Sequence, residues 1–158
     1  MRWYKFSIVL AIGLFLELIV ATICCLLVKE NGEWLASLTL PYFAPKNLFF
    51  YGALSEIIYL SSALSLAFYA QNKHDLPEGI LLSLAEGILQ ILTLLFFFEF
   101  TYEITSFFLA TATMCFSLFM TSAFLGKREA AGIAHLPTLA VHLYFWMVLY
   151  CILTINFA

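Results

Sequence analysis

The chain has 158 residues and a formal net charge of −3, and 64% of its residues are hydrophobic while only 11% are charged. Soluble domains usually contain about 25% charged residues, so this composition excludes an ordinary soluble globular protein. Because no basic cluster accompanies the negative net charge, nucleic acid is not an expected partner.

Five apolar segments follow one another along the sequence, separated by short polar connections. Each is about 20 residues long, which is what a helix needs to cross about 30 Å of hydrocarbon. Little chain remains outside these segments. The sequence therefore predicts an all-α polytopic membrane protein, a five-transmembrane-helix bundle that forms one domain over residues 1–158 and has the lipid bilayer as a partner. The predicted spans are 6–28, 48–70, 79–100, 104–125 and 136–157.

The first span follows basic residues, which imitates the start of a signal peptide. Its apolar run is too long for a signal peptide and lacks a small-x-small cleavage site, so we expect an uncleaved helix. The connections on the N-terminal side carry more Lys and Arg than those on the other side, which predicts a cytoplasmic N-terminus in a bacterial cell membrane. The first group is Arg2, Lys5, Lys73, Lys127 and Arg128, and the second is Lys29 and Lys46.

The first connection, residues 29–47, is the longest and combines aromatic residues with two prolines. Pro41 and Pro45 lack a backbone N–H and restrict the residues before them, so residues 40–46 are predicted to be irregular. Long ordered loops are often lids or binding elements. Trp34 and Phe43 would equally suit an aromatic belt at the membrane surface. Both interpretations stay open.

Ionisable residues occur inside four of the predicted spans: Glu17, Glu56, Glu86 and His142. Such residues are costly in hydrocarbon and normally face a cavity or a partner. They therefore predict a polar cavity within the bundle. Glu86 and His142 are expected at similar depth, where they could form either a static hydrogen-bonded pair or a pair that takes part in proton movement.

The third span has the clearest polar stripe. Glu86, Gln90, Thr93 and Phe97 follow spacings of four, three and four residues, which places them on one helical face. This face could line a ligand pocket, or it could hold helices together by hydrogen bonds across a packed interface. The carboxylate favours the pocket, because interhelical packing rarely needs one.

The fourth span carries Thr113, Ser117 and Thr121 at intervals of four residues. Small residues at this spacing allow close helix approach, either within the monomer or at a homodimer seam. No nucleophile elbow, phosphate-binding motif or Cys/His metal spacing occurs, so neither an enzyme nor a bound metal is expected.

The first connection and the start of the second span resemble the signature of the TspO/MBR family. These are the tryptophan-rich sensory proteins of bacteria and the translocator protein, or peripheral benzodiazepine receptor, of mitochondria. Residues that match at the right spacing are Trp34, Leu38, Pro41, Phe43, Pro45 and Phe50, and in the last span Pro137, Leu139, Ala140 and Tyr150. The resemblance covers most of the chain.

The chain departs from the family pattern where the family has tryptophan. Those positions read Leu48, Leu54, Thr93 and Val141. The chain therefore looks like a divergent member that keeps the scaffold and alters the pocket wall. Cholesterol recognition is not carried over, because the match in the last span is partial.

The resemblance implies a five-helix bundle, often dimeric, that binds porphyrins and other flat hydrophobic ligands in a cavity capped by the first loop, for sensing or transport. No cofactor is expected beyond a porphyrin-type or haem-type ligand. The expected ligand-binding residues are Trp34, Pro41, Phe43, Pro45, Glu86, Gln90, Thr93, Phe97 and His142.

Three other interpretations remain open. Glu17, Glu56 and Glu86 would repel porphyrin propionates if ionised, so either burial keeps them protonated or the ligand is neutral or cationic. The same carboxylates with His142 could instead serve a small proton-coupled secondary transporter. The chain could also be a structural subunit of a larger membrane complex.

Overall fold

The computed structural model describes residues 3–44, 48–71 and 74–157, and these are almost entirely helical. The elements are α1 (Trp3–Glu30), α2 (Gly32–Ser37), α3 (Leu48–Tyr69), α4 (Asp75–Leu94), η1 (Leu95–Glu99), α5 (Glu103–Lys127) and α6 (Glu129–Phe157). Five stretches within them are long and apolar enough to cross a membrane: Tyr4–Glu30, Phe50–Tyr69, Asp75–Glu99, Glu103–Lys127 and Glu129–Asn156. The predicted five-span all-α fold is confirmed.

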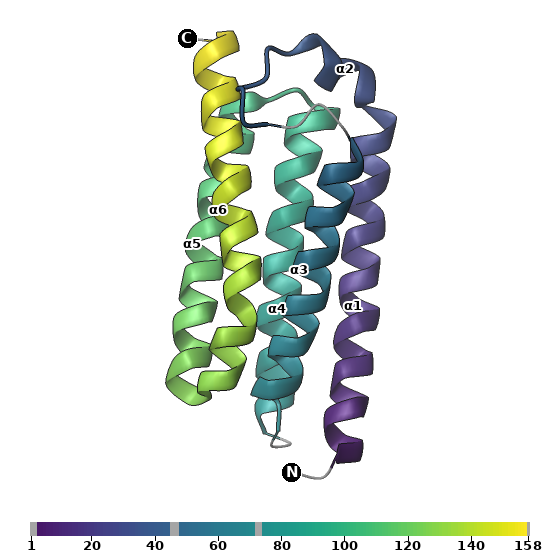
Figure 1. Ribbon diagram of the computed structural model, residues 1–158, viewed down its shortest axis with the longest axis vertical. Coiled ribbons are helices and arrows are strands. Elements are labelled where there is room, and N and C mark those ends of the chain that lie inside the picture. The colour runs from purple at the N-terminus through teal and green to yellow at the C-terminus, as the bar shows by residue number, and fades with distance from the viewer. Residues whose placement is uncertain (1–2, 45–47, 72–73, 158) are drawn as a thin grey trace.

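The five long helices run side by side along the long axis of the molecule, with the described ends of the chain at opposite ends of the bundle (Figure 1). Each long helix packs against two main neighbours, and the order around the bundle is α1, α3, α6, α5, α4 and back to α1. The short helix α2 lies across the end of the bundle where α1 and α6 finish (Figure 1). A closed ring of helices leaves an interior that inward side chains must fill.

The outer surface of the ring is apolar on every long helix, as lipid contact requires. Large exposed side chains include Phe15, Leu60, Leu81, Phe108 and Ile133, which come from α1, α3, α4, α5 and α6 in turn. The interior, by contrast, contains most of the polar side chains of the spans. Hydroxyl groups of α3 face α6, where Thr138 Oγ1 hydrogen-bonds to Ser61 and lies 3.2 Å from Ser62 Oγ.

Close packing of α1 on α3 depends on Gly13. A Cβ atom at this position would lie 3.1 Å from Ala63 Cα, which is too tight for ordinary contact with backbone. Gly52, near the opposite end of the same helix pair, has nothing within 4 Å of such an atom. The two helices are thus in tight contact in the half that contains the start of α1, and space remains in the half near α2.

The connection between α5 and α6 is much shorter than the predicted one. Residues 126–135 were expected outside the spans, yet α5 continues to Lys127, α6 begins at Glu129, and only Arg128 is extended, with φ −154° and ψ 112°. The alanine-rich start of α6 has high helix propensity, which explains the extra turns. Gly132 permits the close approach, because a Cβ there would overlap Leu125.

At the other connections, Pro77 lies in the first turn of α4, and a short turn joins η1 to α5. Residues 40–44 contain no helix or strand, as the proline pattern indicates, while residues 45–47 lie outside the described residues. At the other end of the bundle, Lys127 Nζ lies 2.9 Å from Asp75 Oδ1 and 3.0 Å from Glu78 Oε2, which links α5 to the start of α4.

Candidate functional site

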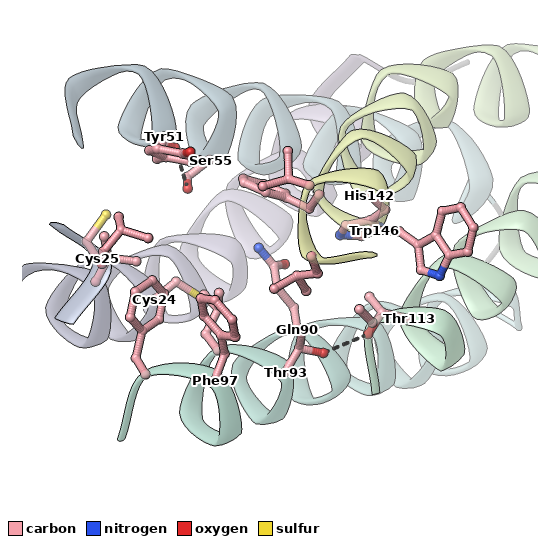
Figure 2. Close-up of a pocket in the computed structure, with 18 of the residues that line it drawn as sticks. Cys24, Cys25, Tyr51, Ser55, Gln90, Thr93, Phe97, Thr113, His142 and Trp146 are labelled. Atoms are coloured by element: carbon pink, nitrogen blue, oxygen red, sulfur yellow. Dashed lines mark hydrogen bonds between the residues drawn. The ribbon is translucent and has the colours of Figure 1, made fainter. Parts of the chain in front are cut away.

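A cavity of about 240 Å³ lies inside the half of the bundle next to α2. All five long helices contribute to its wall, together with α2 and η1 (Figure 2). The lining residues are Cys24, Cys25, Val28 and Lys29 of α1, Leu35 of α2, Tyr51, Gly52 and Ser55 of α3, Gln90, Thr93 and Leu94 of α4, Phe97 and Phe98 of η1, Ala110 and Thr113 of α5, and His142, Phe145, Trp146, Val148, Leu149 and Ile152 of α6.

At the end of the cavity farthest from α2, Gln90 and Thr93 of α4 lie across from His142 of α6 (Figure 2). Lys29, Tyr51 and Ser55 are further polar residues of the wall. The Thr93 hydroxyl is already engaged: it donates to Leu89 O at 2.8 Å, and its oxygen lies 3.3 Å from that of Thr113. His142 is 5% exposed, and neither of its ring nitrogens has a hydrogen-bond partner. The wall is otherwise mainly aliphatic and aromatic, as is typical of small-molecule sites.

The segment 31–44, which we call the lid, lies over the other end of the cavity and contributes Leu35 to its wall. Leu35 reaches the cavity from α2 and is buried in an apolar cluster that also contains Ala44, Val148 and Ile152. The Trp34 ring packs edge-on against Phe97, with ring centroids 4.7 Å apart. The lid is therefore held on the bundle by aromatic and aliphatic contacts.

Three hydrogen bonds add to this attachment. Thr39 N donates to Asn156 Oδ1 at 2.8 Å, and Asn156 Nδ2 donates to Thr39 O at 3.0 Å. Tyr144 donates its hydroxyl proton to Phe43 O at 3.3 Å. All three connect the lid to α6, so the last helix carries both the inner polar end of the cavity and the attachment of its cover.

The structure places eight of the nine predicted site residues, in three groups. Gln90, Thr93, Phe97 and His142 line the cavity, whereas Glu86 lies below it. Trp34, Pro41 and Phe43 belong to the lid and do not reach the cavity wall, because Leu35 and the η1 phenylalanines lie between. Pro45 lies outside the described residues.

Glu86 forms the centre of a buried polar cluster beneath the cavity. Its Oε2 atom lies 3.1 Å from His135 Nε2, and its Oε1 atom lies 3.5 Å from His142 Nδ1. On the far side of its ring, His135 Nδ1 lies 2.9 Å from Thr121 Oγ1. The expected proximity of Glu86 and His142 is confirmed, but the hydrogen bond of Glu86 is to His135.

Sequence reasoning missed His135 because the residue was placed in a connection. The available signal was its position seven residues before His142, which is about two helical turns and puts both side chains on one face. His135 is fully buried, and it binds side chains from α4 and α5 at once. His135 of α6 therefore connects Glu86 on α4 with Thr121 on α5.

The four ionisable residues of the spans do not all converge. Glu17 is buried on α1, close enough to Glu86 for electrostatic interaction. Glu56 is exposed on the outer surface of α3, so the prediction that it faces the interior is wrong. The rotation of α3 explains the error. Ser65 lies on the inner face of this helix, nine residues after Glu56. Nine residues are about two and a half helical turns, so Glu56 lies on the opposite, outer face.

The face of α5 that carries small residues is buried within the chain. Thr113, Ser117 and Thr121 are at most 4% exposed, and two of them contact residues of α4 and α6. Of the two interpretations, packing inside the monomer is the one realised, and this face is not a homodimer seam. A homodimer through another face stays a prediction.

The cluster can hold a proton but lacks the arrangement of an activated nucleophile. Thr121 donates its hydroxyl proton to Ser117 O at 2.8 Å rather than to His135, which is the reverse of what a hydroxyl–histidine–carboxylate triad needs. Within residues 3–44, 48–71 and 74–157, no group of three or more His, Cys, Asp or Glu side chains could hold a metal ion.

Comparison with known proteins identifies the family of the chain. A search of curated proteins gives no match. The family model described as the TspO/MBR family matches residues 7–156, from the first helix to the end of the last. Since this match covers nearly the whole chain, the protein belongs to the TspO/MBR family.

Proposed function

We propose that this membrane protein binds a hydrophobic small molecule in its capped cavity, for sensing or transport rather than for catalysis, and that porphyrin-type compounds are among its ligands. The observation that carries the proposal is the cavity itself, a mainly apolar chamber between five helices with a few hydrogen-bonding groups in its wall. An apolar wall buries the body of a ligand, and a few polar groups fix its orientation.

The size of the cavity restricts what can bind without rearrangement. Its volume of about 240 Å³ lies just below the range of roughly 300–1,000 Å³ that drug-sized ligands occupy. A compact aromatic molecule fits this space, whereas a tetrapyrrole needs the lid to move outward. Three hydrogen bonds to α6 and the apolar contacts of Leu35 and Trp34 oppose such a movement.

The charges around the cavity favour one orientation for an acidic ligand. Lys29 lies on the rim near the lid and is exposed, whereas Glu17 and Glu86 are buried at the level of the polar end or below it. Carboxylates of a porphyrin would therefore be placed toward Lys29, with the apolar ring between the helices. A neutral or cationic ligand has no such requirement.

A binding titration with a matched pair of variants tests the proposal. Purified protein in lipid nanodiscs is titrated with protoporphyrin, and with the smaller probe methylpyrene, while tryptophan quenching is recorded. Ala110 lines the cavity on α5, and Ala112 on the same helix is exposed to lipid. Ala110→Phe should abolish saturable quenching by both compounds, and Ala112→Phe should retain it.

The absence of saturable quenching in the unmodified protein would contradict the proposal, as would equal quenching in the two variants. The second result would mean that the compounds quench from the surrounding lipid. Circular dichroism confirms that each variant keeps its helices.

A second candidate function is proton-coupled transport, which the buried Glu86–His135 pair favours. In proteoliposomes with a trapped pH indicator, an imposed porphyrin gradient would then drive proton movement. Glu86→Gln should abolish that movement, and Glu56→Gln should preserve it, because Glu56 faces away from the cluster. Wild-type protein that moves no protons would remove this candidate.

The orientation in the membrane is also a proposal. The distribution of Lys and Arg favours a cytoplasmic N-terminus, which would place the lid on the opposite side of a bacterial cell membrane. Reporter fusions at the two ends of the chain test this. A cytoplasmic signal from a C-terminal fusion would contradict it.

A further inference from the structure

His142 has an unusual position for a buried histidine. It lines the polar end of the cavity, it is 5% exposed, and both ring nitrogens lack a hydrogen-bond partner. We propose that His142 is the specificity-determining residue of the site: its Nε2 atom is an unprotonated acceptor, and the ligand is a flat hydrophobic molecule that offers it an N–H or O–H donor. This inference rests on the proposed function and deepens it.

The argument begins with the protons of Thr121 and His135. Thr121 has one hydroxyl proton, and it donates that proton to Ser117 O at 2.8 Å. Its oxygen can then only accept from His135 Nδ1, which lies 2.9 Å away. His135 therefore carries a proton on Nδ1.

The next step concerns the contact between His135 Nε2 and Glu86 Oε2, which are 3.1 Å apart. Two bare lone pairs would repel, so one proton lies between these atoms, either on the imidazole or on the carboxyl group. Both alternatives leave the pair with a net charge of zero, as a buried site requires. In both alternatives the other carboxyl oxygen, Glu86 Oε1, carries no proton and is an acceptor.

The orientation of the His142 ring follows from this. Its Nδ1 atom is 3.5 Å from Glu86 Oε1. Because Oε1 is an acceptor, the favourable neutral tautomer has the proton on Nδ1, directed at that oxygen, and Nε2 bare. Nε2 lies across the ring from Glu86, and the side chain borders the cavity opposite Gln90 (Figure 2).

The surrounding charges do not alter this assignment. Glu86 faces His142 from α4 and Glu17 is buried on α1, while α5 presents the hydroxyl groups of Ser117 and Thr121. On α3 the ionisable residue of the span, Glu56, is directed outward. No described cation other than the histidines themselves lies at this depth, so nothing there would repel a proton-donating ligand.

The chemical class of the ligand follows from a bare acceptor in a buried site. A ligand with an N–H or O–H group at its inner end satisfies Nε2, whereas one that presents only acceptors leaves two lone pairs facing each other. Sites that bury a hydrogen-bonding group reject analogues that lack its partner. A carboxylate could contact Nε2 only if His142 first took up a second proton.

The test uses two neutral probes that differ in one hydrogen-bond donor, pyrenemethanol and its methyl ether. Affinities in nanodiscs are read from energy transfer between tryptophan and pyrene. Pyrenemethanol should bind at least about tenfold more tightly than the ether, as expected for one buried, otherwise unsatisfied acceptor. His142→Phe should reduce this ratio to near one, and Leu143→Phe, which changes the exposed neighbouring residue, should preserve it.

Nitrogen-15 NMR of histidine gives a second readout that does not depend on a ligand. The chain contains three histidines, so the ring signals are few. A buried ring that is protonated on Nδ1 and bare on Nε2, with a signal that His142→Phe removes, supports the inference. A His142 ring that carries a proton on Nε2 overturns it.

The outcomes separate the two proposals. If both probes bind the wild-type protein with equal affinity, the role of His142 is wrong while the cavity remains a binding site. If neither these probes nor methylpyrene binds, the proposed function itself is wrong, and the inference falls with it.

Discussion

Asn156 in the last turn of α6 forms a pair of hydrogen bonds with the backbone of Thr39 in the lid, at 2.8 and 3.0 Å, across a separation of 117 residues. The side-chain amide of Asn156 thus satisfies both the backbone N–H and the backbone C=O of Thr39, an exposed residue of the lid. Since the cavity has a smaller volume than most ligand sites, the lid must move for a large ligand, and this clamp opposes that movement.

Replacing Asn156 with Leu should loosen the lid without unfolding the bundle. Two hydrogen bonds are lost, each with a net contribution of about 0.5–1.5 kcal/mol, so the protection of the Thr39 amide should fall about ten- to a hundredfold. Hydrogen exchange followed by mass spectrometry measures this over residues 38–44. A bound porphyrin should also dissociate faster, because the cover opens more often.

Ile155→Ala is the matched control for the clamp, since Ile155 is exposed in the same helical turn and points to lipid. It should leave the exchange of the lid unchanged. If Asn156→Leu and Ile155→Ala give the same exchange rates, the apolar contacts of Leu35 and Trp34 alone hold the lid.

Replacing the carboxylates of two consecutive spans, Glu56 on α3 and Glu86 on α4, should have opposite effects on stability. Glu86→Leu leaves His135 Nε2 without its partner in a fully buried position, and an unsatisfied buried group costs about 1–3 kcal/mol. Glu56→Leu removes a carboxylate from the lipid-facing surface and should be neutral or stabilising. Thermal unfolding in detergent compares the two, and a larger loss for Glu56→Leu would contradict the assigned faces.

Much of this architecture could be predicted from the sequence because hydrocarbon imposes a simple rule. A span needs an uninterrupted apolar length, and five such lengths are visible in the chain. The inward face of the third span was equally predictable, since Gln90, Thr93 and Phe97 follow helical spacing and all three line the cavity. Pro41 and Pro45 of the first connection indicated the irregular backbone of residues 40–44 through local geometry alone.

The polar centre was less predictable, because it depends on how helices rotate and where they begin. His135 looked like a loop residue until the alanine-rich start of α6 proved to be helical. Glu56 was predicted to face the interior because ionisable residues of spans usually do. In the structure, α3 instead buries the face that carries its serines. Trp34 matches the family signature, but Leu35 is the lid residue that reaches the cavity. Each of these depends on tertiary packing that local pattern does not contain.

The two glycines of the α1–α3 pair provide the last prediction, which concerns where the cavity can exist. Gly13→Ala forces a Cβ to within 3.1 Å of Ala63 Cα, and backbone cannot move aside as a flexible side chain could. Overpacking of this kind costs about 1–3 kcal/mol, which exceeds the gain in helix propensity of about 1 kcal/mol. This variant should therefore unfold at a lower temperature than the wild type.

Gly52→Ala has the same chemistry but meets open space, so it should keep the propensity gain and unfold at an equal or higher temperature. A larger side chain at this position, as in Gly52→Leu, should still fold but should weaken methylpyrene binding, because residue 52 borders the cavity. Equal unfolding temperatures for Gly13→Ala and Gly52→Ala would mean that α1 and α3 are uniformly spaced, and the space assigned to the ligand would then have to lie elsewhere in the ring.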